Sequence, residues 1–230
     1  MKPKKKAVRR GKGRPKGVGE KAVGREALVA ATIELLRSHP PATLNLVDIA
    51  RFAGVDPALI RYYFGDRDGL FTAAALAMLD GFQRKLDAND ASPGTAEEWV
   101  RHRVQVIMEQ YLQHPNFHEV VVNQIIRGDP RAGKKALQVL ADRSASRAQS
   151  ILAQGAKLNE MRPVDARFLL IALVGACGFF ASAKPLVEAL FKGEKLTAAT
   201  ADAYGHFVAD LVLEGLRLPG GDRKSRRAGA

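Results

Sequence analysis

The sequence contains a single cysteine, Cys177, and no long hydrophobic run. One thiol cannot form an intrachain disulfide, so a disulfide framework is excluded and a reducing compartment is favoured. The longest stretch without a charged residue, 168–183, is shorter than the roughly 20 residues that a membrane-spanning helix needs. No apolar segment follows the basic N-terminus closely enough to form a signal peptide. These absences predict a cytoplasmic protein that has no membrane partner.

Motifs of catalysis and of metal binding are scarce as well. No glycine-rich phosphate loop, nucleophile elbow or catalytic triad stands out. His114 and His118 lie four residues apart, but Pro115 breaks the helical register between them and no third ligand is evident. Cys177 lies in the most apolar segment and is expected to pack in a core rather than to sense oxidants. We therefore expect no metal, no other cofactor and no enzymatic activity.

Alternating strand patterns and internal repeats are also absent. Apolar residues recur instead at intervals of three and four, which is the spacing of amphipathic helices, so the sequence predicts an all-α fold. Asn45, Asp56 and Asp66 precede the second, third and fourth predicted helices and are expected to be their N-caps. The expected helices span about 24–38, 46–53, 57–63, 66–86, 95–113, 117–127, 131–156, 163–184 and 198–217.

Positive charge is concentrated at the two ends of the chain. The net charge is +12, yet residues 1–25 alone hold eleven Lys and Arg against one acid, and residues 222–230 hold four against one. Basic ends of this kind bind nucleic acid or an anionic membrane surface, or they simply remain solvated. The predicted division is a disordered basic arm (1–21), a first helical domain (22–82), a larger helical domain (83–218) and a disordered basic tail (219–230).

The stretch from Leu46 to Phe71 carries the most informative pattern. It predicts two short helices joined by a tight turn at Gly54. Ala50 is small where the two helices must cross, and Val55 and Ile60 can fill the space between them. This is the arrangement of a helix-turn-helix, in which the second helix enters the major groove of DNA.

The same stretch resembles the tetracycline repressor (TetR) family of transcriptional regulators, and the resemblance covers residues 22–82. It implies a three-helix DNA-binding domain followed by a larger helical domain for ligand binding and dimerisation. The implied function is sequence-specific regulation of transcription, as a repressor that a small-molecule ligand releases from DNA in the cytoplasmic nucleoid. The matching residues are Ala27, Ala31, Leu35-Leu36, Ile49-Ala50, Ala53-Gly54-Val55, Ile60, Tyr63-Phe64 and Asp66-Arg67-Asp68-Gly69-Leu70.

The resemblance also implies which side chains contact DNA. In the third helix only Arg61 can donate hydrogen bonds to a guanine, because residues 57–59 offer apolar surface suited to thymine methyl groups. An aromatic residue is common in the family at the position of Arg61, so the operator sequence is not predicted. Contacts to phosphates are expected to fix register rather than sequence. The predicted base-reading residues are Pro57, Ala58, Leu59 and Arg61, and the predicted phosphate-binding residues are Asn45, Tyr62, Tyr63 and Arg67.

The basic arm offers a second DNA contact. Residues 12–16, Lys-Gly-Arg-Pro-Lys, resemble the core of an AT-hook, in which Arg14 would enter a narrow A·T-rich minor groove. The alternative is diffuse attraction of the whole arm to phosphates. A different function is also open: a nucleic-acid-compacting protein that acts through this arm without sequence preference. A helical enzyme with a basic tail is the third hypothesis.

The last two long helices are expected to form a homodimer on a palindromic double-stranded operator. Small residues among large apolar ones let backbones approach closely, and two helices from each subunit would make a four-helix interface. The alternative is that one of these helices is wholly intramolecular. The predicted interface residues are Leu170, Val174, Gly175, Gly178, Phe179, Tyr204, Phe207, Val208 and Leu211.

Polar and aromatic residues embedded in apolar helices are the candidates for a pocket that binds the small-molecule effector. A concave apolar site with a few polar groups is the usual form of such a pocket. The sequence does not indicate the identity of the effector. The candidate residues are Trp99, Arg103, Met108, Tyr111, Phe117, Asn123, Gln124 and Arg127.

Overall fold

The computed structural model describes residues 18–88, 94–128 and 130–218. Throughout these residues the regular structure is helical and no strand occurs, so the prediction of an all-α fold is confirmed. The helices are α1 (Val18–Leu35), α2 (Leu46–Phe52), α3 (Ala58–Phe64), α4 (Arg67–Ala88), α5 (Ala96–Gln113), α6 (Phe117–Val121), α7 (Pro130–Lys157), α8 (Ala166–Ser182), α9 (Lys184–Leu190) and α10 (Ala198–Leu216). A 3₁₀ turn spans Pro41–Thr43, and a π-helical segment spans Val122–Ile126.

The side chains that the sequence selects as caps accept backbone hydrogen bonds at the starts of α2, α3 and α4, although Pro57 rather than Asp56 directly precedes α3. The side chain of Asn45 accepts a hydrogen bond from the backbone N–H of Asp48 at 2.8 Å. Asp56 and Asp66 accept from backbone N–H groups two and three residues later, also at 2.8 Å. These bonds satisfy amides that have no partner inside the helix. Gly54, in the turn between α2 and α3, has φ +67°, a left-handed conformation that favours glycine.

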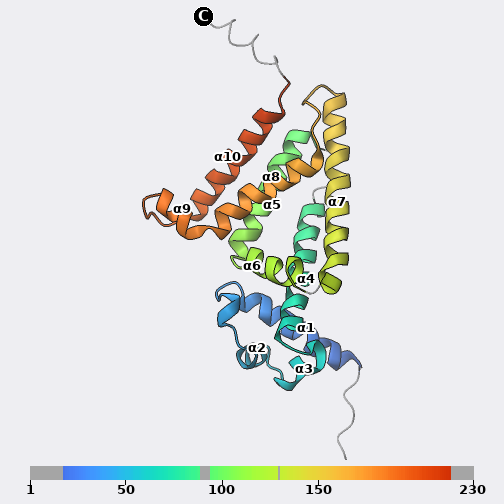
Figure 1. Cartoon of the computed structure of the whole chain (residues 1–230), viewed down its shortest axis with the longest axis vertical. Helices are drawn as coiled ribbons and strands as arrows, with labels where there is room; N and C mark the ends of the chain where they lie inside the picture. Colours follow the sequence, from blue (N-terminus) through green and yellow to red (C-terminus); the bar gives the residue numbers. More distant parts are fainter. Residues whose placement is uncertain (1–17, 89–93, 129, 219–230) are drawn as a thin grey trace, which may run out of the picture.

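Helices α1, α2 and α3 form one end of the molecule, and α4 runs from them into the larger body (Figure 1). The core of this end consists of Leu28 on α1, Ile49 and Ala50 on α2, and Ile60 on α3, all almost completely buried. Since Ala50 and Ile60 are the residues that the helix-turn-helix pattern requires inside, the local sequence accounts for this packing. The exposed faces of α2 and α3 therefore have fixed positions.

The larger body is a bundle in which α5 packs against α10, α8 and α7, and α7 packs against α4 and α8. The capping box at the start of α5 is formed by Thr95 and Glu98, each of whose side chains bonds to the backbone of the other. A similar pair, Thr197 and Thr200, begins α10. The body is large enough to enclose its own core, which includes Leu173 and Cys177, both fully buried.

Three predicted helices are wrong in detail. The helix expected at 24–38 spans Val18–Leu35 instead. The helix expected at 163–184 begins at Ala166, ends at Ser182 and is followed by α9, which turns away from it by 83°. Pro185 lies in the first turn of α9, where its missing N–H costs nothing, whereas inside a continuous helix it would break the hydrogen-bond ladder. The helix expected at 117–127 is α-helical only to Val121 and continues as the π-helical segment.

Among residues 18–88, 94–128 and 130–218, no single helix is both long and apolar enough to cross a membrane. Only α8 and α9 taken together meet the length and composition required, and they are sharply bent relative to each other.

Candidate DNA-binding surface, dimer face and effector site

The predicted reading helix α3 lies at the end of the molecule (Figure 1), and it carries an exposed row of side chains. Ala58 and Arg61 are exposed, as is Pro57 just before the helix, and Tyr62 exposes 63% of its surface. Arg61 forms no ion pair among the described residues, so its guanidinium is free to bind a base or a phosphate. Asn45, at the start of α2, is exposed as well.

Three of the predicted DNA contacts are turned partly inward. Leu59 and Tyr63 are half-buried against α1, where a Cβ on Gly24 would lie 3.7 Å and 3.4 Å from their side chains. The guanidinium of Arg67 donates to the backbone oxygen of Pro41, and its Cζ lies 4.2 Å from the centre of the Phe71 ring. The guanidinium of Arg67 therefore has partners within the protein when no DNA is bound.

The surface also includes a basic residue that the sequence analysis did not select. Arg51 projects from α2, with 75% of its side chain exposed, and pairs with Asp48 at 3.0 Å. Its position on the helix before the reading helix makes it a candidate for a phosphate contact. An arginine three residues before the glycine of a turn is too common a pattern to identify a DNA contact by itself. Arg14 and the rest of the arm lie outside the described residues.

One face of α8 and α10 is apolar and exposed. Phe168 and Ile171 on α8 expose 72% and 69% of their surface, and Phe207 and Leu211 on α10 are exposed to a similar degree. Val174, Gly175 and Phe179, which were predicted for the interface, also lie exposed. Phe168 and Ile171 were missed, although their three-residue spacing extends the stripe that contains Val174.

Two of the predicted interface residues face the interior of the protomer instead. Val208 is buried, and Gly178 is buried against Tyr111, whose hydroxyl would lie 3.0 Å from a Cβ at that position. The small size of Gly178 therefore serves packing of α8 on α5. Leu170 and Tyr204 are half-buried, and the Tyr204 ring stacks on Phe180 at 4.3 Å.

The eight predicted effector-binding residues do not come together around one cavity. Asn123 and Arg127 are exposed, and Gln124 accepts a hydrogen bond from Thr72 at 3.2 Å. The remaining five are buried, and of these Met108 borders a cavity between α5 and α10. They are Trp99, Arg103, Met108, Tyr111 and Phe117.

The buried members of this set form two aromatic groups. The guanidinium of Arg103 lies 5.5 Å from the centre of the Trp99 ring. Tyr111 and Phe117 meet edge to face with a centroid separation of 6.0 Å. Burial raises the pKa of Tyr111 to about 12 and that of the nearby Cys177 thiol to about 11, so both side chains are neutral at physiological pH.

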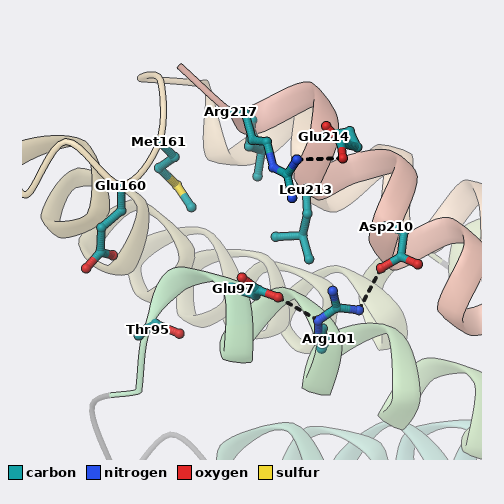
Figure 2. Close-up of a pocket in the computed structure, with 10 residues that line it drawn as sticks. Thr95, Glu97, Arg101, Glu160, Met161, Asp210, Leu213, Glu214 and Arg217 are labelled. Atoms are coloured by element: carbon teal, nitrogen blue, oxygen red, sulfur yellow. Dashed lines mark hydrogen bonds and ion pairs between the residues drawn. The ribbon is translucent and has the colours of Figure 1, made fainter. Parts of the chain in front are cut away.

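The surface of the body contains several cavities. One, of about 490 Å³, is bounded by the start of α5, the end of α10 and the connection between α7 and α8 (Figure 2). Arg101 spans it, with Nε 3.0 Å from Glu97 of α5 and Nη1 2.8 Å from Asp210 of α10 (Figure 2). A second cavity, about 260 Å³, lies between α5 and α10, and Met108 contributes to it. A third, about 350 Å³, lies between α4 and α7.

The connection between α5 and α6 holds the end of α1. The side-chain amide of Asn116 donates to the backbone oxygens of Leu36 and His39 at 2.8 and 3.0 Å. Nε of Arg37 donates in return to the backbone oxygen of Gln113 at 3.1 Å. Because carbonyls at the end of a helix lack partners within it, these bonds tie the first three helices to the body. A change in the body therefore has a direct route to the reading helix.

No group of three or more His, Cys, Asp or Glu residues is placed to hold a metal ion in residues 18–88, 94–128 and 130–218. His114, one of the two histidines considered above, is instead part of the connection between the domains. Burial, followed by the positive charge of Arg37 and Lys85, lowers the pKa of His114.

Known proteins match both parts of the chain. The family model described as bacterial regulatory proteins, tetR family, matches residues 28–74, and the model described as tetracyclin repressor-like, C-terminal domain, matches residues 97–212. The transcriptional regulator RutR of Escherichia coli K12 is 22% identical over 199 residues, which cover 84% of this chain and 90% of RutR. The transcriptional regulator BetI of Rhizobium meliloti is 32% identical over 89 residues, which are 39% of this chain and 44% of BetI.

Solved structures share the fold across both domains. A TetR/AcrR-family regulator from Thermobifida fusca has a TM-score of 0.64 at 20% identity, covering 84% of this chain and 98% of its own. AibR, solved in complex with isovaleryl coenzyme A and operator DNA, has a TM-score of 0.57 at 12% identity, covering 84% and 97%. The two family models together span the helix-turn-helix and most of the body. The chain therefore belongs to the TetR family of bacterial transcriptional regulators.

Proposed function

We propose that this regulator is a repressor that binds a palindromic operator as a homodimer and is released by a small molecule. The observation that carries the proposal is the exposed row on α3, held in place by the buried Ala50 and Ile60 and offering an unpaired Arg61. In this proposal α3 enters the major groove, and Asn45, Tyr62 and Arg51 lie along the flanking phosphates. The basic arm adds a contact whose nature stays a prediction from the sequence.

Dimerisation is supported by the apolar face of α8 and α10. Exposed large side chains such as Phe168, Ile171, Phe207 and Leu211 lie together there, and contiguous apolar surface of this kind marks an interaction site. A twofold interface uses the same surface on both subunits, so one apolar face is sufficient. Two reading helices related by such an axis match the two halves of a palindrome.

Release by a ligand requires that ligand binding and DNA binding favour different arrangements of the two reading helices. The bonds of Asn116 and Arg37 give the body a hold on the end of α1, and α4 is shared by both domains. AibR, which has this fold, was solved with a coenzyme A thioester and operator DNA. From AibR we carry over only this general mode of action. We also propose that the protein acts at the nucleoid.

The test is selection of bound fragments from a pool of random DNA, using the full chain. The proposal predicts enrichment of a palindrome, which Arg61→Ala should weaken. The matched control is Lys157→Ala, which removes an exposed cation from the last turn of α7, away from α3. Strongly salt-dependent binding without any enriched sequence would contradict the proposal and support the compaction hypothesis instead.

A further inference from the structure

The cavity between α4 and α7 is a groove with a continuous apolar wall. Leu76 and Leu79 of α4 face Val139 and Leu140 of α7 across a space of about 350 Å³. Leu79 is buried, whereas Val139 is exposed, so the groove extends from the interior of the bundle to solvent. A space of this size, with apolar walls, suits the hydrocarbon part of a small molecule.

The groove also contains a buried acceptor without a donor. Gln83 is only 8% exposed, and its amide nitrogen donates to Asp87 at 2.6 Å. Its amide oxygen has no hydrogen-bond partner among the described residues. The opposite amide orientation would turn this oxygen toward the Asp87 carboxylate, and two acceptors would then face each other. The bond to Asp87 therefore assigns the amide nitrogen to that side and the oxygen to the other. Buried acceptors are nearly always paired, and a ligand that donates a hydrogen bond would satisfy this one.

The rim of the groove is positively charged. Lys135 and Arg143 are exposed and line it from α7, and eight residues of helix separate them by about 12 Å. Neither forms an ion pair within the part of the chain that the structure describes. Asp80, the acid in the lining, is paired with Arg84. Two unpaired cations above an apolar wall complement an anionic group attached to a hydrocarbon chain.

We propose that this groove binds the effector, and that the effector is an anionic amphiphile with a hydroxyl or amide N–H near its charged group. The chain lies along the leucine wall, the anion pairs with Lys135 or Arg143, and the donor bonds to the amide oxygen of Gln83. This assignment rests on the proposed function as a ligand-responsive regulator. Since α4 also packs against α1 and α3, a molecule that separates α4 from α7 acts directly on the reading helix.

The first experiment measures binding by calorimetry to the full chain without DNA. The probes are 3-hydroxydodecanoate, dodecanoate, dodecyl phosphate and the methyl ester of 3-hydroxydodecanoate. Adding the hydroxyl should tighten binding of the carboxylate several-fold, about as much as one hydrogen bond, and removing the charge should weaken it by about tenfold or more. Dodecanoate and dodecyl phosphate distinguish a carboxylate from a phosphate as the preferred anion. Equal affinity for the acid and the methyl ester would overturn the proposal.

The second experiment uses variants of the groove. Lys135→Ala with Arg143→Ala should weaken 3-hydroxydodecanoate by about tenfold or more and leave the methyl ester unchanged, because both residues are exposed and act by charge. Gln83→Met should remove the preference for the hydroxyl. Lys134→Ala with Lys157→Ala is the matched control, since it removes two exposed cations from α7 outside the groove. Equal loss in the control would overturn the proposal.

The two proposals fail separately. If a palindrome is enriched but none of the anionic probes binds saturably, the groove assignment is wrong and the proposed DNA-binding function stands. If the probes bind with the expected preferences and lower the affinity for the palindrome, both are supported. Binding of the probes that leaves operator affinity unchanged would overturn the groove as the effector site.

Discussion

Arg61 is the residue on which we propose that sequence recognition depends. It is exposed on α3, unpaired among the described residues, and flanked by side chains that offer DNA mainly apolar or phosphate contacts. We predict that Arg61→Ala costs about 1–3 kcal/mol of operator binding and relaxes the base preference at one position of each half-site. Binding to a library of single-base operator variants measures both. An equal loss on every sequence would show that Arg61 contacts only a phosphate.

Arg67 shows where a family pattern misleads at the residue scale. Its sequence position suggests a phosphate contact, but its guanidinium is bonded to the carbonyl of Pro41 and packed on the ring of Phe71. Sequence spacing places Arg67 in the first turn of α4 but says nothing about the backbone of the 3₁₀ turn that reaches it in space. We therefore predict that Arg67→Ala lowers the thermal midpoint of unfolding, whereas Arg51→Ala, which removes an exposed arginine, leaves it nearly unchanged.

Cys177 is predicted to be unreactive in the native protein. It is fully buried, and burial raises its pKa to about 11, so the nucleophilic thiolate is almost absent at pH 8. A thiol-specific reagent should label the protein only after denaturation. The sign of the pH effect follows from the raised pKa: labelling of the folded state should remain slow until the pH approaches 11. Rapid labelling at pH 8 would show that α8 opens frequently.

At the scale of elements, Asn116 joins the body to the DNA-binding domain. From the connection between α5 and α6, its side-chain amide donates hydrogen bonds to the backbone carbonyls of Leu36 and His39. Each such bond contributes about 0.5–1.5 kcal/mol. Asn116→Ala should therefore lower the free energy of unfolding by about 1–3 kcal/mol, as measured by urea denaturation.

The same variant tests communication between the domains. Gln154→Ala is the control, because Gln154 is an exposed amide on α7, away from the α5–α6 connection and outside the proposed groove. We expect Asn116→Ala, but not the control, to reduce the change in operator affinity that a bound effector produces. If both variants keep the full response, α1 is not held by this contact during release.

The sequence predicts the elements best where local chemistry decides them. The capping bonds of Asn45, Asp56 and Asp66 and the turn at Gly54 depend on residues within three positions of one another, and all of them form, although Pro57 rather than Asp56 directly precedes α3. The sequence analysis did not predict α9 as a separate helix. A proline such as Pro185 can mark the end of one helix or the first turn of the next, and apolar spacing alone does not distinguish the two. The π-helical segment after Val121 likewise has no signature in the apolar periodicity.

At the scale of the whole molecule, the apolar face of α8 and α10 accounts for assembly. We predict that Phe168→Glu with Ile171→Glu gives a folded monomer at micromolar concentration and weakens operator binding. Both side chains are exposed in the protomer, so charges there disturb the dimer rather than the core. Leu158→Glu, at another exposed apolar position, is the control. Light scattering that shows a dimer for the double variant would place the interface elsewhere.

The candidate sites differ in how far the sequence could define them. A reading surface on α3 follows from one contiguous segment, and most of its residues are exposed as expected. The effector pocket depends on which faces of α4, α5 and α7 meet, and this is set by packing between segments far apart in the chain. Gln83, Lys135 and Arg143 are unremarkable in sequence and become a candidate site only through the contact of α4 with α7.

The central claim is that two copies of α3 read one palindrome. Hydroxyl-radical footprinting on the selected operator tests this most directly. The account predicts two protected windows related by twofold symmetry, centred about 34–36 Å or one helical turn apart, or a whole multiple of that spacing. A single protected window, or even protection along any DNA regardless of sequence, would contradict it.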